Sequence, residues 1–289
     1  MDEIAMVENS AESTKTEIKE FWERETCGTR YGSAEDRRAY FDEIEQARYR
    51  LEPFIKDFAD FPSAQGKRVL EVGVGAGTDF SNWCKYAEHA TGVDLTDAAV
   101  ELTKERLSLA GVSSDRHEVM QADGENLPFE DNQFDIVYTY GVLICTPDID
   151  KAFRECCRVL KPGGTLKTMF YRVPSVTGFL LWVRYALLKG KPMMSASDAS
   201  FRNLESPGTR AMKDDKCSSI LSRSGFEKIE TRRKLCGGDT LEIDLSSKFR
   251  NPAYRLIQAL YPSWFVRRVL GDRLGFYLLV TAKKPHRIQ

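Results

Sequence analysis

The most constraining feature of this 289-residue sequence is a run of three glycines at alternate positions, directly after a short apolar stretch. Val69 to Val72 are expected to form a buried strand that is apolar apart from Glu71. Gly73, Gly75 and Gly77 follow, and the residues after them have the apolar spacing of a helix. A tight strand-to-helix turn needs glycine where the backbone must approach a bound ligand. The turn therefore predicts a nucleotide-like ligand at the end of a parallel strand.

Two details narrow the class of ligand. A dinucleotide-binding turn has glycine at the position where this chain has Thr78. Glu71 stands two residues before the first glycine, where a carboxylate suits a ligand that carries an amino-acid cation. The next predicted strand, Ala90 to Asp94, ends in an acid 21 residues after Gly73. An acid at about this distance from the turn is where a ribose diol is held.

These motifs resemble those of the class I S-adenosylmethionine-dependent methyltransferases, and the resemblance extends from about residue 67 to 171. It implies that Asp123 takes the adenine amino group, supported by the loop Leu127-Pro128-Phe129, and it matches Phe134-Asp135 at the start of the fourth strand. The cofactor is then S-adenosylmethionine. The residues expected to bind it are Glu71, Gly73, Gly75, Gly77, Asp94, Leu95, Ala122, Asp123, Gly124, Tyr140 and Gly141.

From Lys67 onward, strand and helix patterns alternate, as is typical of a doubly wound parallel sheet. We expect an α/β fold with a mostly parallel seven-stranded sheet, whose last strand is antiparallel, and with helical cap and lid insertions. The predicted division is an N-terminal helical cap at 1–62, a Rossmann-like core at 63–171, and the rest of the core at 172–289. The last part contains two lid insertions, 172–210 and 236–275.

Composition excludes several classes. The 42 basic residues balance 43 acidic ones, which argues against a dedicated nucleic-acid binder. The N-terminus lacks the basic-then-apolar pattern of a secretory signal, and the longest apolar run, 176–188, is interrupted by Arg184. Seven cysteines contain no C-x-x-C pair, and the three histidines, His89, His117 and His286, lie in apparent surface or tail stretches. We therefore expect a reduced, cytoplasmic protein without a metal site.

Candidate catalytic groups are polar side chains near the predicted sheet edge. The loop Cys27 to Gly32 is expected to close over the site with Tyr31 facing the reacting centre, because glycines bracket its polar residues. Tyr140, Tyr171 and Glu205 are the other candidates. Many relatives carry His-His where this chain has Ile144-Cys145, so a pair of polar groups near the methyl acceptor is missing here.

Three functions stay open on the sequence alone. The first is methyl transfer to a small-molecule acceptor, favouring oxygen or nitrogen, in a lidded pocket rich in aromatic residues. The second is methyl transfer to a lipid or quinone by an enzyme in weak contact with a membrane surface, as indicated by Phe179 to Leu188 and Trp264 to Arg268. The third is a catalytically silent S-adenosylmethionine-binding protein, since the His-His pair is absent.

Overall fold

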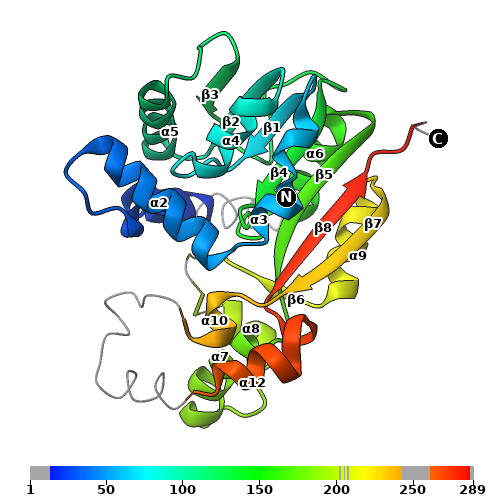
Figure 1. Ribbon diagram of the computed structural model, residues 1–289. Helices are drawn as coiled ribbons and strands as arrows, with labels where there is room; N and C mark the ends of the chain where they lie inside the picture. Colours follow the sequence, from blue (N-terminus) through cyan, green and yellow to red (C-terminus); the bar gives the residue numbers. More distant parts are fainter. Residues whose placement is uncertain (1–13, 202, 205, 207, 243–260, 287–289) are drawn as a thin grey trace.

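The chain folds around one mixed sheet with helices on both faces, as seen in a computed structural model (Figure 1). The structure describes the whole chain except residues 1–13, 202, 205, 207, 243–260 and 287–289. Along the sheet the strands follow the order β3-β2-β1-β4-β5-β8-β7. Their bounds are β1 Arg68–Val72, β2 His89–Asp94, β3 His117–Gln121, β4 Phe134–Tyr140, β5 Leu160–Arg172, β6 Ala211–Met212, β7 Glu227–Lys234 and β8 Tyr277–Lys283.

The predicted fold class is confirmed, with one addition. Strand β8 lies between β5 and β7 and is antiparallel to both, whereas the first five strands pair in parallel. The two-residue strand β6 pairs with the end of β5, off the main path, so the described sheet has eight strands where seven were expected. A strand this short carries no alternation of apolar residues, so the sequence gives no signal for it.

Two apolar layers cover the two faces of the sheet. On one face α2, α3, α4 and α5 pack over a core that includes Phe58, Trp83 and Tyr138. On the other face α6 and α9 pack over Phe153, Phe170 and their neighbours. The bounds on these faces are α2 Arg37–Leu51, α3 Ile55–Ala59, η2 Phe61–Ala64, α4 Thr78–Tyr86, α5 Asp97–Ala110, α6 Ile149–Val159 and α9 Asp214–Arg223.

The first residue of helix α2 is determined by its N-cap, Asp36. Ser33, a residue type that often caps helices, lies before this helix, but α2 begins at Arg37 with Asp36 as its N-cap residue. The Asp36 carboxylate accepts a hydrogen bond from the backbone N–H of Ala39 at 2.9 Å, which satisfies a free donor of the first turn. Ser33 instead donates its own N–H to Glu43, so it belongs to the preceding loop.

A smaller body of helices adjoins the carboxyl end of β5 and the beginning of β8 (Figure 1). We call it the helical lobe; it comprises α7 Val176–Tyr185, η3 Leu187–Lys189, α8 Ala196–Phe201, α10 Gly237–Thr240, α12 Ser263–Phe265, the π-helix η5 Val266–Leu270 and η6 Gly271–Leu274. Helix α10 contacts both α7 and η5, so the segments before and after β7 form one packed unit.

The carboxylate of Asp239 holds this lobe to the sheet. It is fully buried and accepts hydrogen bonds at 2.8–2.9 Å from the backbone of Cys236, the backbone and hydroxyl of Thr177, and the backbone of Phe276. These donors belong to α7, to the start of α10 and to the residue before β8. One side chain therefore joins three parts of the chain that are distant in sequence.

Replacing this carboxylate should destabilise the lobe. We expect Asp239→Ala to lower the free energy of unfolding by about 3 kcal/mol, because it leaves several buried donors without an acceptor. Chemical denaturation monitored by tryptophan fluorescence measures this, since Trp182 and Trp264 belong to the lobe. Asp42→Ala, which removes an exposed carboxylate of α2, is the control and should change stability by less than about 0.5 kcal/mol. Equal effects of the two variants would contradict the role given to Asp239.

Candidate functional site

The glycine turn lies between β1 and α4, at the carboxyl edge of the sheet. Gly73 has φ 87°, and a Cβ added there would lie 2.2 Å from the Val142 side chain, so only glycine fits. Its N–H donates to the carbonyl of Val93 at 2.7 Å, which ties the turn to β2. The N–H of Gly75 donates to Asp94 at 3.1 Å. The glycine turn and the acid at the end of β2 are therefore joined by hydrogen bonds and together form one side of the predicted cofactor site.

Asp94 lies at the end of β2, as predicted for the residue that holds the ribose. One carboxylate oxygen accepts from both the backbone and the hydroxyl of Thr96, at 3.0 and 2.8 Å, and the other accepts from Gly75. Burial raises the pKa of Asp94 above its ordinary value, although these hydrogen bonds act in the opposite direction. The N–H of Ala122 donates to the carbonyl of Asp94 at 2.9 Å, so the ends of β2 and β3 are joined beside it.

Glu71 supplies the test of whether the site fits an amino-acid cation. Only 4% of this residue is exposed, and one of its carboxylate oxygens is buried without a hydrogen-bond partner. Burial raises the pKa of Glu71 well above its ordinary value, and the negative charge of Asp79 raises it further. A buried carboxylate without a partner is costly, whereas pairing with an ammonium group would satisfy it. The methionyl end of S-adenosylmethionine supplies such a group, so the site fits this cofactor.

A buried ion pair that the sequence did not reveal joins α2 to the turn. Asp79, in the first turn of α4, accepts two hydrogen bonds from Arg48, the shorter at 2.5 Å, and one each from Tyr49 and Tyr138. Burial alone would raise the pKa of Asp79, but the Arg48 guanidinium and these donors hold it below its ordinary value. Arg48 also lies 4.9 Å from the ring centroid of Tyr140. In the sequence, the sign of this contact was Arg48 itself, a charged residue next to the apolar face of α2.

The N-terminal helical segment 14–24 contacts the acid expected to hold adenine, Asp123, and its neighbour Glu125. Lys15 lies 2.7 Å from Asp123 and 2.8 Å from Glu125, and Glu23 accepts from the N–H of Ala98 at 3.2 Å. Between this segment and the end of β2 lies a hollow of about 510 Å³, lined by Lys15, Thr16, Lys19, Glu20, Glu23, Arg24 and Leu95. The predicted adenine acceptor is thus paired with a lysine, a contact that no local sequence pattern indicates.

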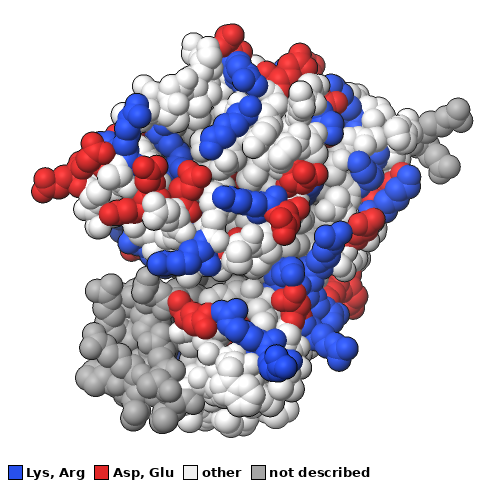
Figure 2. All heavy atoms as spheres, viewed as in Figure 1, with Lys and Arg blue, Asp and Glu red and all other residues white. Residues whose placement is uncertain are grey.

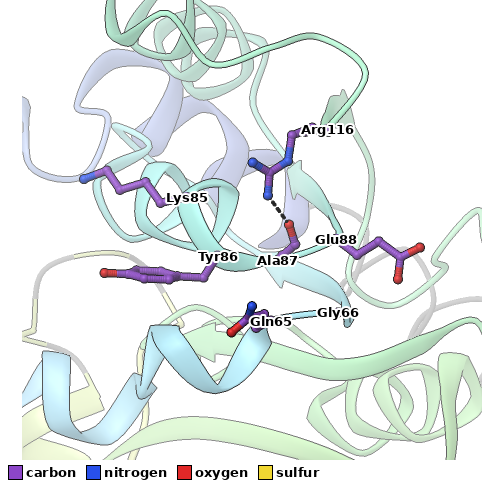
Figure 3. A pocket seen from close by; sticks show the side chains of 7 residues that line it. All are labelled: Gln65, Gly66, Lys85, Tyr86, Ala87, Glu88 and Arg116. Carbon is purple, nitrogen blue, oxygen red and sulfur yellow. Dashed lines mark hydrogen bonds between the residues drawn. The ribbon is translucent and has the colours of Figure 1, made fainter.

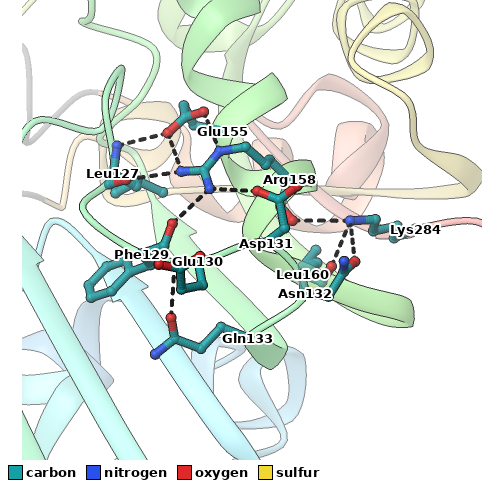
Figure 4. Close-up of polar contacts among 10 residues, drawn as sticks. All are labelled: Leu127, Phe129, Glu130, Asp131, Asn132, Gln133, Glu155, Arg158, Leu160 and Lys284. Atoms are coloured by element: carbon teal, nitrogen blue, oxygen red, sulfur yellow. Dashed lines mark hydrogen bonds and ion pairs between the residues drawn. The ribbon is translucent and has the colours of Figure 1, made fainter.

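The loop Leu127-Pro128-Phe129, which was expected to support adenine binding, is held in place by Arg158 of α6 (Figure 4). Its guanidinium donates to the carbonyls of Leu127 and Phe129, at 3.0 and 2.7 Å, and pairs with Asp131 and Glu155. Glu155 in turn accepts from the N–H of Leu127 at 2.9 Å. The neighbouring carboxylates raise the pKa of Arg158 above its ordinary value. The loop expected to support adenine is therefore held in one conformation by charged hydrogen bonds.

The loop Cys27 to Gly32 packs on the glycine turn. A Cβ added at Gly75 would lie 3.3 Å from the Cβ of Cys27, and one at Gly28 would lie 3.7 Å from Ala76. Tyr31 packs with Phe41, Ile44 and Ala76, and its hydroxyl accepts from Arg30 at 2.8 Å; η1 Thr29–Tyr31 forms the middle of the loop. The loop is thus adjacent to the predicted cofactor site, while closure with Tyr31 facing the reacting centre stays a prediction.

The remaining candidates lie on the other side of the turn. Tyr140 and Tyr171 end or nearly end β4 and β5. Gly141, with φ 74°, follows Tyr140 directly, while Gly124 packs near Leu143. Glu205 lies outside the described residues. Ile144 and Cys145, where relatives carry His-His, are buried, and Cys145 contacts Thr209 at 3.2 Å, so they serve packing.

A second hollow, of about 570 Å³, is lined by none of these candidate residues; its lining side chains are shown in Figure 3. Its lining includes Gln65, Gly66, Ala87 and Arg116, which precede β1, β2 and β3, so it lies at the amino ends of the strands. Ligands of open α/β sheets bind at the opposite, carboxyl ends.

Within the part of the chain that the structure describes, no group of three or more histidine, cysteine or acidic side chains is placed to hold a metal ion.

Residues 70–167 match the methyltransferase domain family. Together with the sheet order and the glycine turn, this match identifies residues 70–167 as a class I S-adenosylmethionine-dependent methyltransferase domain, and S-adenosylmethionine is the cofactor of this class. The match covers the central part of the chain and leaves both the N-terminal helices and the helical lobe outside it.

Two curated relatives illustrate the sequence similarity. Phthiotriol/phenolphthiotriol dimycocerosates methyltransferase 1 of Mycobacterium ulcerans is 39% identical over 103 residues, which are 35% of this chain and 36% of that protein. Demethylmenaquinone methyltransferase of Clavibacter sepedonicus is 29% identical over 177 residues, covering 60% of this chain and 70% of that protein. The chain thus spans little more than a third of the first relative.

Solved structures are similar in fold. Phosphoethanolamine N-methyltransferase 2 of Haemonchus contortus, in complex with phosphomonomethylethanolamine and S-adenosylhomocysteine, superposes with a TM-score of 0.57 at 20% identity, over 93% of this chain and 60% of that one. A methyltransferase of Aquifex aeolicus gives a TM-score of 0.51 at 16% identity, over 82% of this chain and 92% of that one. At these identities the likeness concerns the fold alone.

Asp94 provides the direct test of the cofactor site. We expect Asp94→Ala to weaken S-adenosylmethionine binding by about 1.5–3 kcal/mol, as for the loss of hydrogen bonds to a charged group, which is roughly ten- to a hundredfold in Kd. Isothermal titration calorimetry measures this, with circular dichroism to verify the fold. Asp115→Asn, at an exposed carboxylate before β3, is the control and should bind normally. Unchanged affinity in a folded Asp94→Ala variant would overturn the placement of the ribose.

Lys15 provides an independent test of the adenine acceptor. If adenine takes the place of the Lys15 ammonium on Asp123, binding must first break that ion pair. We therefore expect Lys15→Met to tighten S-adenosylmethionine binding, by about tenfold if one charged hydrogen bond is involved. The control is Lys19→Met, whose side chain is 41% exposed and lies 3.8 Å from Asp97. Weaker binding by Lys15→Met would mean that the lysine belongs to the bound state.

Proposed function

We propose that the chain transfers the methyl group of S-adenosylmethionine to an oxygen or nitrogen acceptor at the carboxyl edge of β4 and β5. The observation that supports this most strongly is the buried carboxylate of Glu71, which lies two residues before Gly73 and one strand away from Asp94, and one of whose oxygens has no hydrogen-bond partner. When bound, the sulfonium supplies an already activated methyl group. The protein's part is then to align the acceptor and exclude water.

For the class of acceptor, the distribution of exposed apolar side chains favours a lipid or quinone over a water-soluble metabolite. Among the described residues, nearly all large apolar side chains that are exposed belong to the helical lobe. Met193 is 96% exposed, Leu188 74% and Trp264 67%. The others in the lobe are Phe179, Leu187, Phe201, Phe265 and Val269. A cluster of this kind marks an interaction site, since soluble surfaces rarely expose so many large apolar groups together.

The charges of the lobe suit an anionic membrane surface. Lys189, Lys191 and Arg268 lie close in sequence to the exposed apolar residues, as aromatic and cationic residues do in interfacial helices. In Figure 2 the lower end of the lobe is largely uncharged, and several basic side chains lie above it, toward the core. No helix within the described residues has the length and apolar character needed to cross a bilayer. The proposed contact is therefore with the surface of a membrane.

The relatives agree with a lipid-like acceptor. The names of the two curated relatives refer to phthiotriol dimycocerosates and to demethylmenaquinone. These names describe those proteins, and their alignments with this chain are partial. They nevertheless support the second of the functions that the sequence left open, methyl transfer to a lipid or quinone, above transfer to a small soluble molecule.

Transfer of a tritium-labelled methyl group tests this function. The purified protein is incubated with labelled S-adenosylmethionine and, separately, a naphthoquinol in phosphatidylglycerol vesicles, a total lipid extract, and an aqueous metabolite extract. We expect label in one of the two lipid samples. Label in the aqueous extract alone would favour a soluble acceptor, and label in none of them would favour a catalytically silent cofactor-binding protein.

Membrane contact by the lobe is tested by flotation with phosphatidylglycerol vesicles. We expect Leu188→Ser and Trp264→Ser each to lower the bound fraction by about tenfold in partition coefficient, because burying a large apolar side chain contributes about 1.5–3 kcal/mol. The matched control is Tyr86→Ser, which removes an exposed aromatic ring of the core, 43% exposed, at the amino ends of the strands. Flotation of all three variants like the wild type would contradict a membrane-facing lobe.

A further inference from the structure

A carboxylate that the sequence analysis did not single out lies among the tyrosines at the carboxyl edge of β4 and β5. Glu52 is the C-terminal cap residue of α2, and one of its oxygens accepts a hydrogen bond from the Tyr277 hydroxyl at 2.8 Å. The rings of Tyr140 and Tyr277 are 6.2 Å apart, and Tyr171 lies 5.5 Å from Tyr277. These residues come from α2, β4, β5 and β8, so the fold brings together groups that are as far apart as 225 positions.

Two polar atoms of this cluster lack hydrogen bonds. The second carboxylate oxygen of Glu52 is buried without a hydrogen-bond partner, and its nearest cation is Arg48 at 3.5 Å. The Tyr140 hydroxyl is also buried without a hydrogen bond of normal geometry. It lies near enough to Glu52 to oppose the rise that burial causes in the pKa of that carboxyl, and Glu52 adds to the rise that burial causes in the pKa of Tyr140. Leaving a buried polar group without a full hydrogen bond costs about 1–3 kcal/mol. A ligand hydroxyl that donates to Glu52 and accepts from Tyr140 would supply both atoms with a partner.

The cluster lies beside the predicted position of the reacting methyl group. Strand β4 pairs with β1, which leads into the glycine turn, and Tyr140 is the last residue of β4. Arg48 connects the two places, because it binds Asp79 just after the turn and also lies over the Tyr140 ring. Glu52 is one helical turn after Arg48. An acceptor held against Tyr140 and Glu52 would therefore be next to the cofactor's methionyl end.

We propose that Glu52 is the general base of this enzyme, and that it accepts the proton of a hydroxyl-bearing acceptor held against Tyr140. This inference rests on the proposed methyl-transfer function and narrows its acceptor to a molecule with an ionisable O–H group, such as a quinol or a lipid alcohol. Tyr277 is a positioning residue, because it holds the other oxygen of the carboxylate.

The step balances in atoms and charge. The acceptor's O–H bond breaks and its proton passes to the free oxygen of Glu52. The electron pair on the acceptor oxygen forms the new bond to the methyl carbon. The electron pair of the carbon–sulfur bond leaves with sulfur, which becomes the neutral thioether of S-adenosylhomocysteine. The protonated Glu52 then returns its proton to water after the products depart.

The environment of Glu52 makes its carboxylate a stronger base than an exposed glutamate. Burial raises the pKa of Glu52 above its ordinary value, while the charge of Arg48 opposes this rise. A base acts only when it is ionised, so turnover should rise with pH through the raised pKa of Glu52 and level off above it. The titratable and charged groups around it are Arg48 on α2, Asp79 on α4, Tyr140 on β4, Tyr277 on β8 and Cys236 before α10.

The test compares the wild-type protein with Glu52→Gln in labelled methyl transfer to the naphthoquinol vesicles and to the total lipid extract, over a range of pH. We expect Glu52→Gln to lower kcat by about 10²- to 10⁴-fold, as for removal of a general base, and to abolish the acidic limb of its pH profile. Affinity for S-adenosylhomocysteine, measured by calorimetry, should change less than about threefold. Tyr277→Phe should lower kcat less and keep the limb.

Controls separate the possible results. Glu101→Gln makes the same substitution at a side chain that is 72% exposed on α5, and it should leave kcat unchanged. If Glu52→Gln fails to fold, Glu52→Asp retains a carboxylate, so it should lose rate while keeping the acidic limb. A folded Glu52→Gln variant with wild-type kcat and pH profile would overturn the role of Glu52 alone. A wild-type protein that labels no sample would contradict the proposed function and, with it, this base.

Discussion

The ion pair between Arg48 and Asp79 is the interaction on which the arrangement of the site depends. Asp79 is almost fully buried at the start of α4, where a carboxylate also interacts favourably with the helix N-terminus. Its partners are one guanidinium and two tyrosine hydroxyls. Removing either partner of a buried ion pair strongly destabilises the fold, because the other charge is then left without compensation. The pair therefore fixes α2 against the glycine turn.

That fixed position has consequences for both halves of the site. On one side of the turn, the ion pair helps to position the predicted cofactor-binding residues, among which the N–H of Gly75 donates a hydrogen bond to Asp94. On the other side it places Glu52, one turn further along α2, over the tyrosines that end β4 and begin β8. The N-terminal helices thus contribute charged groups to a site whose backbone frame comes entirely from the sheet.

The core could be predicted from the sequence because its signals are local. The alternation of strands and helices, the glycines of the turn and the acid ending β2 each depend on a few adjacent residues, and β4 begins at Phe134-Asp135, as the resemblance implied. The groups that the sequence missed act across long separations. Lys15 meets Asp123 108 positions away, and Glu52 meets Tyr277 across 225. A lone lysine or glutamate on an N-terminal helix gives no sign of such a partner.

A crystal structure of the protein with S-adenosylhomocysteine is the most direct test of this account. We expect the ribose hydroxyls within hydrogen-bond distance of Asp94, the adenine amino group on Asp123 in place of the Lys15 ammonium, and the amino group of the homocysteine end on Glu71. The sulfur should then face Tyr140 and Glu52. A nucleoside bound elsewhere, or one whose sulfur points away from the β4 edge, would contradict the placement of both the cofactor and the acceptor.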